Sequence, residues 1–375
     1  MSAAVPTIYE SIVCPTGPGN PRNGEAAIVE LANGELLLAY TRFGEWLPGS
    51  FAADAIELKL GSDHYPADIR ACFSKDNGYT WSDPCVFQEN VGAISVIGPS
   101  FLRLQSGTLL FAFEIKNDAT SDTHAYVRSS TDEACTWSEP VLATPEDGYV
   151  IANQGSRGMV QTDTGRVLMP ASKAVSIDQN ARAYHMASTC FVSDDEGQTW
   201  KRNAEYMDLP ATLHGLQEPG IVVLSDGTLW MYMRTELGTI YSSYSTNDGD
   251  NWSTPRPTEL IAPLSPSTGT RIPHSADLLM IYNDRSIEPH SAELSDVFQK
   301  RTPLSSAVSS DSGRTWHHHK TIESDETKSY TYTNINFHKS STLLTYYVGP
   351  VETGGAFVTS ANLKLKIVPT VAWTQ

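Results

Sequence analysis

The chain has 375 residues, of which 43 are acidic and 26 basic, so its formal net charge at pH 7 is −17. This excess of negative charge argues against nucleic acid or an anionic membrane as the main partner, although a small anionic ligand needs only a local cluster of arginines. The five cysteines lack the spacing of a zinc site or a disulfide framework, and no apolar stretch is long enough to span a membrane. We expect neither a metal nor another cofactor. The first residues do not resemble a signal peptide, so the protein is cytoplasmic as written, or secreted if a signal peptide has been removed.

Taken in chain order, the sequence predicts six similar apolar strands, each preceded by a turn. The turns of the clearest four begin at Gly34, Gly107, Gly165 and Gly227, and those of two weaker copies begin at Ala276 and Ser341. No long amphipathic helix pattern interrupts the series. Repeats of roughly 60 residues are typical of propellers, in which each unit is a four-stranded sheet.

An eight-residue turn follows each of the first five strands. These box turns read Ser-x-Asp-x-Gly-x-Thr-Trp and occupy residues 74–81, 130–137, 193–200, 245–252 and 309–316. Ala134 replaces the glycine in the second copy, and Asn247 and Asn251 replace the aspartate and threonine in the fourth. The chemistry suits a hairpin turn, because Asp bonds its own turn backbone and Gly supplies positive φ. We therefore assign the boxes a structural role.

The sequence thus predicts an all-β fold, a six-bladed β-propeller with five box turns, built as one domain over residues 1–375. Residues 7–12 are expected to pair with the last blade, because closing the ring removes exposed sheet edges. The longest unrepeated insertion, residues 44–62, is expected to cover the ligand pocket.

Further segments place polar residues near the expected central channel. They read SDH from residue 62, QEPGIVVLSDG from residue 217, MRT from residue 233, RTPL from residue 301 and YTYTNI from residue 330. Together with the box turns, they resemble the sialidase superfamily of Asp-box propellers over essentially the whole chain. In that family three arginines bind the substrate carboxylate, a tyrosine paired with a glutamate is the nucleophile, and a loop aspartate is the acid and base.

The resemblance implies three catalytic residues. Tyr332 takes the place of the nucleophile and fits better than Tyr330, and Glu218 takes that of its paired glutamate. Asp63 takes the acid/base role because it lies 11 residues before the first box, with Asp54 in the same loop as the reserve.

The resemblance also implies a set of substrate-binding residues. Arg234 and Arg301 match the family's second and third arginines. Arg22 is the candidate for the first, although its surroundings differ from the family's Arg-Ile-Pro motif; that motif occurs intact at Arg271, in the wrong blade, and Arg157 is a further alternative. The remaining candidates for substrate contact are Glu25, His64 and Gln217.

Physical chemistry supports these roles. Arginine presents a planar fork of donors that matches a carboxylate. A neutral phenol is not repelled by a substrate carboxylate, and a paired glutamate can accept its proton. Asp63 must be protonated to help the leaving group depart, so burial or neighbouring carboxylates should raise its pKa.

The sequence is compatible with three functions. The first is a retaining exo-glycosidase that removes a terminal sialic acid, or a related ulosonic acid, from a glycoconjugate. The second is a hydrolase or lyase acting on another acidic sugar such as a uronide, which the altered first motif and Glu25 favour. The third is a non-catalytic propeller that binds glycans or proteins, against which the joint presence of Glu218, Tyr332 and Asp63 weighs.

Overall fold

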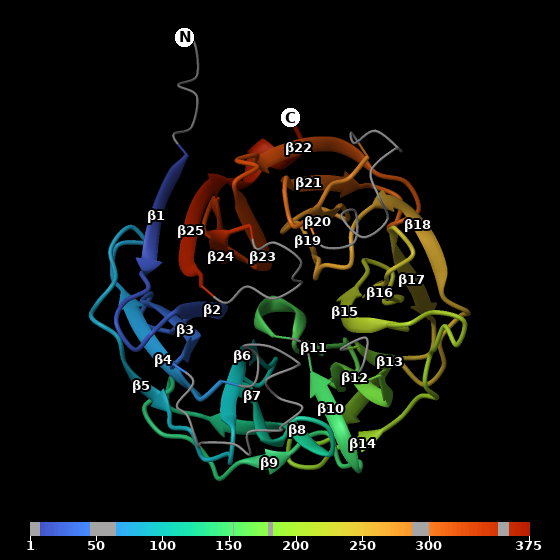
Figure 1. Ribbon diagram of the computed structural model, residues 1–375, viewed down its shortest axis with the longest axis horizontal. Coiled ribbons are helices and arrows are strands. Elements are labelled where there is room, and N and C mark those ends of the chain that lie inside the picture. The colour runs from blue at the N-terminus through green and yellow to red at the C-terminus, as the bar shows by residue number, and fades with distance from the viewer. Residues whose placement is uncertain (1–7, 46–64, 153, 179–182, 287–299, 352–359) are drawn as a thin grey trace.

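The computed structural model describes residues 8–45, 65–152, 154–178, 183–286, 300–351 and 360–375. These residues form an all-β propeller in which sheets are arranged around a central axis (Figure 1). The only helices in these ranges are two short 3₁₀ segments, η2 (Gly155–Arg157) and η3 (Thr370–Trp373). Neither is long and apolar enough to cross a membrane.

Four sheets of the propeller have four strands each. The first contains β2 (Arg22–Glu30), β3 (Leu36–Phe43), β4 (Ala67–Ser74) and β5 (Cys85–Gln88). The second contains β15 (Gln217–Val223), β16 (Leu229–Arg234), β17 (Thr239–Ser245) and β18 (Arg256–Ile261). The third contains β19 (Thr268–Arg271), β20 (Leu278–Asn283), β21 (Leu304–Ser309) and β22 (His317–Glu323). The fourth contains β23 (Lys328–His338), β24 (Ser341–Pro350), β25 (Asn362–Pro369) and β1 (Tyr9–Cys14).

A fifth sheet has nine strands. Its first part contains β6 (Ser95–Arg103), β7 (Leu109–Asp118), β8 (Asp122–Ser130) and β9 (Val141–Leu142). Its second part contains β10 (Gly148–Ala152), β11 (Val160–Gln161), β12 (Val167–Asp178), β13 (Ala183–Ser193) and β14 (Lys201–Arg202). A short parallel pairing of β8 with β10 joins the two parts.

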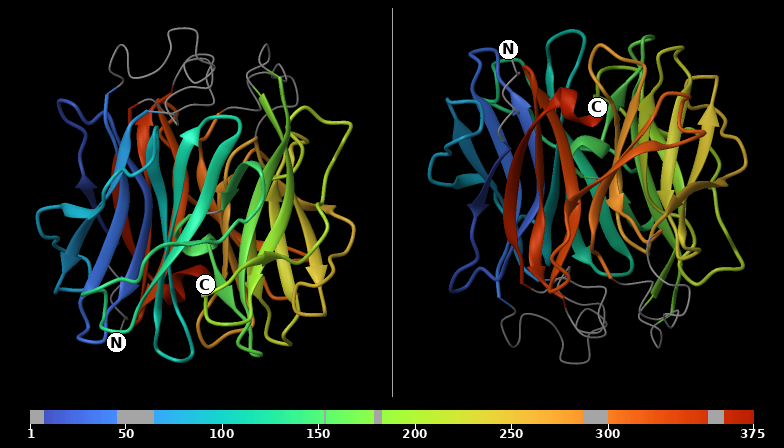
Figure 2. Two further views of the ribbon diagram at one scale, coloured as in Figure 1. Left: turned by 90° about the horizontal axis from the view of Figure 1, so that it is seen from below. Right: turned by 90° about the horizontal axis from the view of Figure 1, so that it is seen from above.

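The six apolar strands predicted from the sequence are confirmed as β3, β7, β12, β16, β20 and β24. Their central residues are buried on both faces. The reason is that neighbouring sheets pack face to face: one core cluster joins Trp230 and Tyr232 of β16 to Met280 of β20 and to the box residue Trp316. The strands run along the propeller axis, as the side views in Figure 2 show.

Ring closure is confirmed for the described residues. The first strand, β1, pairs antiparallel with β25, so that Tyr9 lies opposite Ile367 and Ser11 opposite Leu365. One sheet therefore contains both ends of the chain, and the edge of β25 is covered.

The five box turns share one set of hydrogen bonds. In the first, the Gly78 amide donates to Ser74 Oγ at 2.8 Å, and the Thr80 amide and hydroxyl donate to the Asp76 carboxylate at 2.8 and 2.6 Å. The glycine and the residue before it both have positive φ, 92° and 64° for Gly78 and Asn77. Two successive left-handed residues define a type I′ hairpin turn. Each box joins the third strand of its sheet to the fourth, which places it at the end opposite to the starts of the inner strands.

The ends where the inner strands β2, β6, β15 and β23 begin define the mouth of the propeller. Near the axis lies η2, the green coiled segment at the centre of Figure 1, which contacts all four of these strands and β19. Its Gly155 has a φ of 62°, and a Cβ there would lie 2.8 Å from the Ala26 carbonyl oxygen, so a side chain would not fit. The inner strands and η2 together fix the geometry of the mouth.

Candidate active site

Four inner strands contain the same irregularity just inside the mouth. Each has a β-bulge, and the first residue of the bulge has positive φ: Glu25 (50°), Gly98 (71°), Glu218 (45°) and Tyr332 (52°). A non-glycine residue in this conformation costs about 1–3 kcal/mol and is typical of functional sites. Side chains from three sheets, those of Glu25, Glu218 and Tyr332, are thereby brought to equivalent positions around the axis.

At a bulge, a backbone amide has no carbonyl to bond to on the paired strand. Here hydroxyl oxygens of neighbouring sheets accept these hydrogen bonds instead. The Glu218 amide donates to Ser172 Oγ of β12 at 2.9 Å, and the Gly98 amide donates to Thr41 Oγ1 of β3 at 2.9 Å. These bonds hold the strained positions in place, because a buried unpaired amide would otherwise add its own cost.

Tyr332 and Glu218 are in direct contact, although 114 positions separate them in the chain. The Tyr332 hydroxyl donates to Glu218 Oε1 at 3.1 Å. Arg234 donates to the same oxygen from Nη1 at 2.9 Å, and both side chains of this ion pair are largely buried. Among the described residues, neither Glu218 Oε2 nor Arg234 Nε has a hydrogen-bond partner. Tyr332, Glu218 and Arg234 thus form one cluster, and two of its polar atoms, Glu218 Oε2 and Arg234 Nε, could still bond to a ligand.

The other two predicted arginines approach the same tyrosine. The guanidinium carbon of Arg301 lies 5.8 Å from the centre of the Tyr332 ring, and its Nη1 donates to Thr331 Oγ1 at 3.1 Å. Arg22 lies 5.5 Å from the ring centre of Tyr347, whose ring packs edge-on against that of Tyr332 at 5.5 Å. Arg234 and Arg301 therefore lie close to Tyr332, and Arg22 lies beside Tyr347, the ring that packs against Tyr332.

Glu25 pairs with the candidate first arginine. Its Oε1 lies 3.9 Å from Arg22 Nη2, and its Oε2 accepts a hydrogen bond from Thr41 Oγ1 at 3.0 Å. Arg22 also stacks on Phe43, with 3.6 Å between the guanidinium carbon and the ring centre. Pairing with an arginine offsets the repulsion that an extra carboxylate would exert on an acidic sugar.

Close packing in this region depends on Gly24. A Cβ on Gly24 would lie 1.9 Å from Cε1 of Tyr347. The absence of a side chain lets the Tyr347 ring lie against the backbone of β2, within reach of both Arg22 and Tyr332.

The remaining predicted residues have different outcomes. Gln217 pairs with Arg234 across β15 and β16, and its Nε2 donates to the Tyr184 carbonyl at 3.3 Å. Arg157 belongs to η2, and only its backbone is described. Arg271 is exposed at the last position of β19, at the end away from the mouth. Asp63, His64, the reserve Asp54 and residues 46–62 of the expected cover loop lie outside the described residues.

Sequence reasoning missed Glu114, which lies on β7 opposite Ile97, the residue before the β6 bulge. Burial raises the pKa of this carboxyl to about 8; Lys116 and the Ala152 amide oppose the shift, while Glu25 and Glu218 add to it. Neither carboxyl oxygen has a hydrogen-bond partner of good geometry within the part of the chain that the structure describes, although the Ala152 amide lies near enough to lower the pKa. Only the register of the bulged strands could have revealed it, since nothing in the local sequence marks the position.

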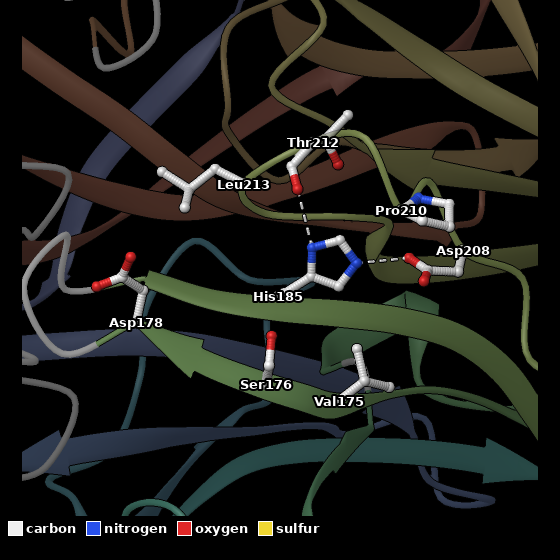
Figure 3. A pocket seen from close by; sticks show the side chains of 8 residues that line it. All are labelled: Val175, Ser176, Asp178, His185, Asp208, Pro210, Thr212 and Leu213. Carbon is white, nitrogen blue, oxygen red and sulfur yellow. Dashed lines mark hydrogen bonds and ion pairs between the residues drawn. The ribbon is translucent and has the colours of Figure 1, made fainter.

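An open hollow lies between the β12–β13 hairpin and residues 208–213 (Figure 3). It encloses about 420 Å³. His185 Nε2 lies 2.7 Å from Asp208 Oδ1, and Nδ1 lies 3.0 Å from the Thr212 carbonyl oxygen, so both ring nitrogens are engaged. Ser176 lines the same hollow, but His185 has no nitrogen left to accept its proton, which argues against a Ser-His-Asp triad.

Histidine, cysteine and carboxylate side chains do not gather in groups of three or more at any point of the described ranges in a way that could hold a metal ion. His317, His318 and His319 follow the last box on β22, where His319 Nδ1 lies 3.1 Å from the Tyr282 hydroxyl.

Comparisons with known proteins agree on the fold. A family model described as a BNR repeat-like domain matches residues 95–343. A protein of unknown function from Dyadobacter fermentans superimposes with a TM-score of 0.70 at 17% identity, covering 97% of this chain and 99% of that one. The intramolecular trans-sialidase from Ruminococcus gnavus, solved with oseltamivir carboxylate, gives a TM-score of 0.70 at 13% identity and covers 98% of both chains. A sialidase from Streptococcus pneumoniae gives 0.68 at 12% identity, covering 96% of this chain and 71% of that one.

The curated proteins contain no significant match to the sequence. At these identities the solved structures establish a common β-propeller fold, and a shared fold does not by itself determine an activity.

Proposed function

Because the chain belongs to the BNR repeat-like domain family, we propose that it is a retaining exo-glycosidase that hydrolyses a terminal sialic acid, or a related ulosonic acid, from a glycoconjugate. The observation that carries the proposal is the hydrogen bond from the Tyr332 hydroxyl to Glu218 Oε1 at 3.1 Å. A tyrosine bonded to a buried carboxylate, beside several arginines, is the arrangement that this chemistry requires.

In the first step, the Tyr332 oxygen attacks the anomeric carbon while Glu218 accepts the phenolic proton. Asp63 protonates the departing glycosidic oxygen. In the second step, water attacks the anomeric carbon, Asp63 takes a proton from that water, and Glu218 returns its proton to the tyrosine oxygen. Two displacements at one carbon give net retention of configuration.

The arginines bind the substrate carboxylate in this proposal. Arg234 uses one of its five N–H donors on Glu218, which leaves donors for a ligand, as its Nε indicates. Arg22 and Arg301 complete the carboxylate site from the neighbouring sheets, and Gln217 and Arg157 border it.

We also infer that the propeller has six blades and forms a single domain over residues 1–375. The nine-stranded sheet supports this count, because only the short β8–β10 pairing joins its two parts. Separating them gives six units, each containing one of the six predicted apolar strands.

The alternative is a hydrolase or lyase acting on a uronide. Glu25 favours it, because a carboxylate at the mouth can contact sugar hydroxyls. A non-catalytic glycan-binding propeller is the third candidate, and the contact between Tyr332 and Glu218 argues against it.

A panel of fluorogenic glycosides tests the class and the substrate together. It should contain an α-ketoside of N-acetylneuraminic acid, a ketoside of a deaminated ulosonic acid, and glucuronides and galacturonides. We expect release from the ulosonic ketosides only. Release from the uronides alone would replace the first proposal by the second, and inactivity on all of them would favour a binding role.

A further inference from the structure

The residues opposite the four bulges form a second ring around the axis, which we call the inner ring: Thr41, Glu114, Arg234 and Tyr347. Each lies on the second strand of its sheet, opposite the residue that precedes the bulge. The shared register places them at one level and directs them to one region near the axis.

Three members of the inner ring contact the bulge side chain of their own sheet. Thr41 bonds to Glu25, Arg234 bonds to Glu218, and Tyr347 packs edge-on against Tyr332. Glu114 has no such partner, because the bulge residue of its sheet is Gly98. The space that a side chain at Gly98 would enter is occupied by Gln154, whose Cγ would lie 2.6 Å from a Cβ there.

Two polar groups at this position consequently lack partners. Both carboxyl oxygens of Glu114 and Oε1 of Gln154 are buried without a hydrogen-bond partner of good geometry among the described residues, and the Ala152 amide is the one nearby donor that affects the Glu114 carboxyl. Glu114 is 2% exposed, a burial similar to that of Arg22 and Glu25. A buried carboxyl with two unpaired oxygens costs several kcal/mol in an apolar core, so a position that retains one is expected to bind something.

We propose that Glu114, at the inner-ring position opposite the start of the β6 bulge against which Gln154 packs, binds hydroxyl groups of the sugar ring and thereby selects a polyhydroxylated ligand. This inference rests on the proposed function, since it concerns the same mouth. A neutral acid offers one donor and one acceptor, and the Gln154 carbonyl offers a second acceptor, which suits hydroxyls that both donate and accept.

The electrostatic surroundings favour the neutral form. Burial raises the pKa of Glu114, and the carboxylates of Glu25 on β2 and Glu218 on β15 raise it further, while Lys116 on its own strand lowers it. Lys116 is partly engaged, because its Nζ donates to the Tyr149 hydroxyl at 3.2 Å. A neutral Glu114 can lie close to an acidic sugar without repelling its carboxylate, and an ionised one cannot.

The test measures the affinity of the full-length protein for free N-acetylneuraminic acid and free glucuronic acid by calorimetry, at pH 7 and pH 9. Glu114→Gln keeps a neutral donor and acceptor, so its affinity at pH 7 should match the wild type. Glu114→Leu removes both and should bind at least about tenfold more weakly, the equivalent of one lost buried hydrogen bond. At pH 9 the wild type should weaken, and Glu114→Gln should keep its affinity for the sugar.

Controls separate folding from binding. Glu114→Leu should melt at or above the wild-type temperature, because it removes an unpartnered buried acid. Glu133→Gln, an equal change at a box turn far from the mouth, should leave the affinity unchanged. If Glu114→Leu fails to fold, the pH dependence of Glu114→Gln still decides the question.

The outcomes distinguish the two proposals. Wild-type affinity in Glu114→Leu, or an equal loss at pH 9 in Glu114→Gln and the wild type, would overturn the role of Glu114 and leave the glycosidase proposal standing. A wild type that binds an acidic sugar but cleaves none of the glycosides would overturn the glycosidase proposal, and the affinity comparison would still measure Glu114. Failure of the wild type to bind either sugar would count against both.

Discussion

At the scale of single residues, the bulge in β23 decides which tyrosine reaches the mouth. Tyr330 and Tyr332 are two positions apart and would face the same side of a regular strand. The bulge at Tyr332 breaks this alternation, so Tyr330 packs into the core against Tyr346, while Tyr332 meets Glu218. The family resemblance favoured Tyr332 without a physical reason, and the bulge supplies one.

The bulges also explain what the sequence could not predict. Glu25 and Glu218 adopt positive φ only because neighbouring sheets bond and pack around them, and no local residue pattern encodes this. Glu114 was not predicted for the same reason: its place near the axis follows from the register of β6 and β7 and not from its local sequence. By contrast, the contacts around Tyr332 involve Arg22, although its surrounding motif departs from the family's.

Replacing Tyr332 by Phe should reduce kcat by roughly 10³-fold or more, because the attacking oxygen is removed. The melting temperature should change little, since one hydroxyl is lost from a site that already has unfilled bonding capacity. The matched control is Tyr330→Phe, which removes a hydroxyl two positions away and should keep activity. Steady-state kinetics on the best glycoside of the panel would show this, and equal losses in the two variants would contradict the assignment.

The raised pKa of Glu114 predicts a pH dependence of stability. The folded protein holds this proton up to about pH 8, whereas an exposed glutamic acid in the unfolded chain releases it near pH 4.3. The stabilising contribution is therefore complete below about pH 4.3 and is lost as the pH rises towards 8, by at most about 1.4 kcal/mol per pH unit. Urea unfolding of the wild type and Glu114→Gln across this range should show the variant gaining relative stability as the pH rises. Parallel curves would contradict the prediction.

At the scale of elements, the box turns were the most predictable part of the chain, because their chemistry is local. Serine, aspartate, glycine and threonine bond within eight residues, and the two bonds from backbone amides recur even in the fourth box, where asparagine replaces aspartate at position 247. What the sequence did not show is that the box glycines also contact the preceding sheet. A Cβ on Gly249 would lie 2.5 Å from Leu168 Cδ2, and one on Gly313 would lie 2.9 Å from the Trp230 ring.

Comparing Gly249→Ala with Gly227→Ala separates the need for a positive φ from the need for space against the neighbouring sheet. The two glycines have nearly equal φ, +84° and +82°, but a Cβ on Gly227 meets nothing within 4 Å. Both variants should lose stability from backbone strain, and Gly249→Ala should lose about 1 kcal/mol more because it overpacks the contact with Leu168. Chemical denaturation would measure the difference. Equal losses would show that Leu168 moves aside without cost.

At the scale of the whole molecule, the repeat predicted the propeller and the closure of its ring. The expectation rested on the cost of an exposed edge, and β1 does cover β25. The merging of two units into one nine-stranded sheet was not foreseen. It arises because Gly148 and Tyr149, at the start of β10, pair in parallel with Asp122 and Thr123 at the start of β8, a contact between two units that no repeat pattern predicts.

Deleting residues 1–14 should lower the melting temperature by at least about 5 °C, because it removes β1 and exposes the edge of β25. The truncated protein should also self-associate, which light scattering would detect. Glu10→Gln is the control: it removes the partly exposed ion pairs of Glu10 with Lys364 at 2.9 Å and Lys366 at 3.5 Å but keeps β1, and it should cost less than about 1 kcal/mol. Calorimetry showing an unchanged transition after the deletion would contradict a role for β1 in closing the ring.

The central claim is that Tyr332 is a nucleophile activated by Glu218, and covalent trapping tests it most directly. The full-length protein is treated with a fluorinated ulosonic acid analogue carrying a good leaving group, then digested and examined by mass spectrometry. The account predicts one glycosyl adduct, on Tyr332, that is absent in Tyr332→Phe and forms more slowly in Glu218→Gln. An unmodified Tyr332 in an enzyme that cleaves the parent glycoside, or a first product with inverted anomeric configuration, would contradict it.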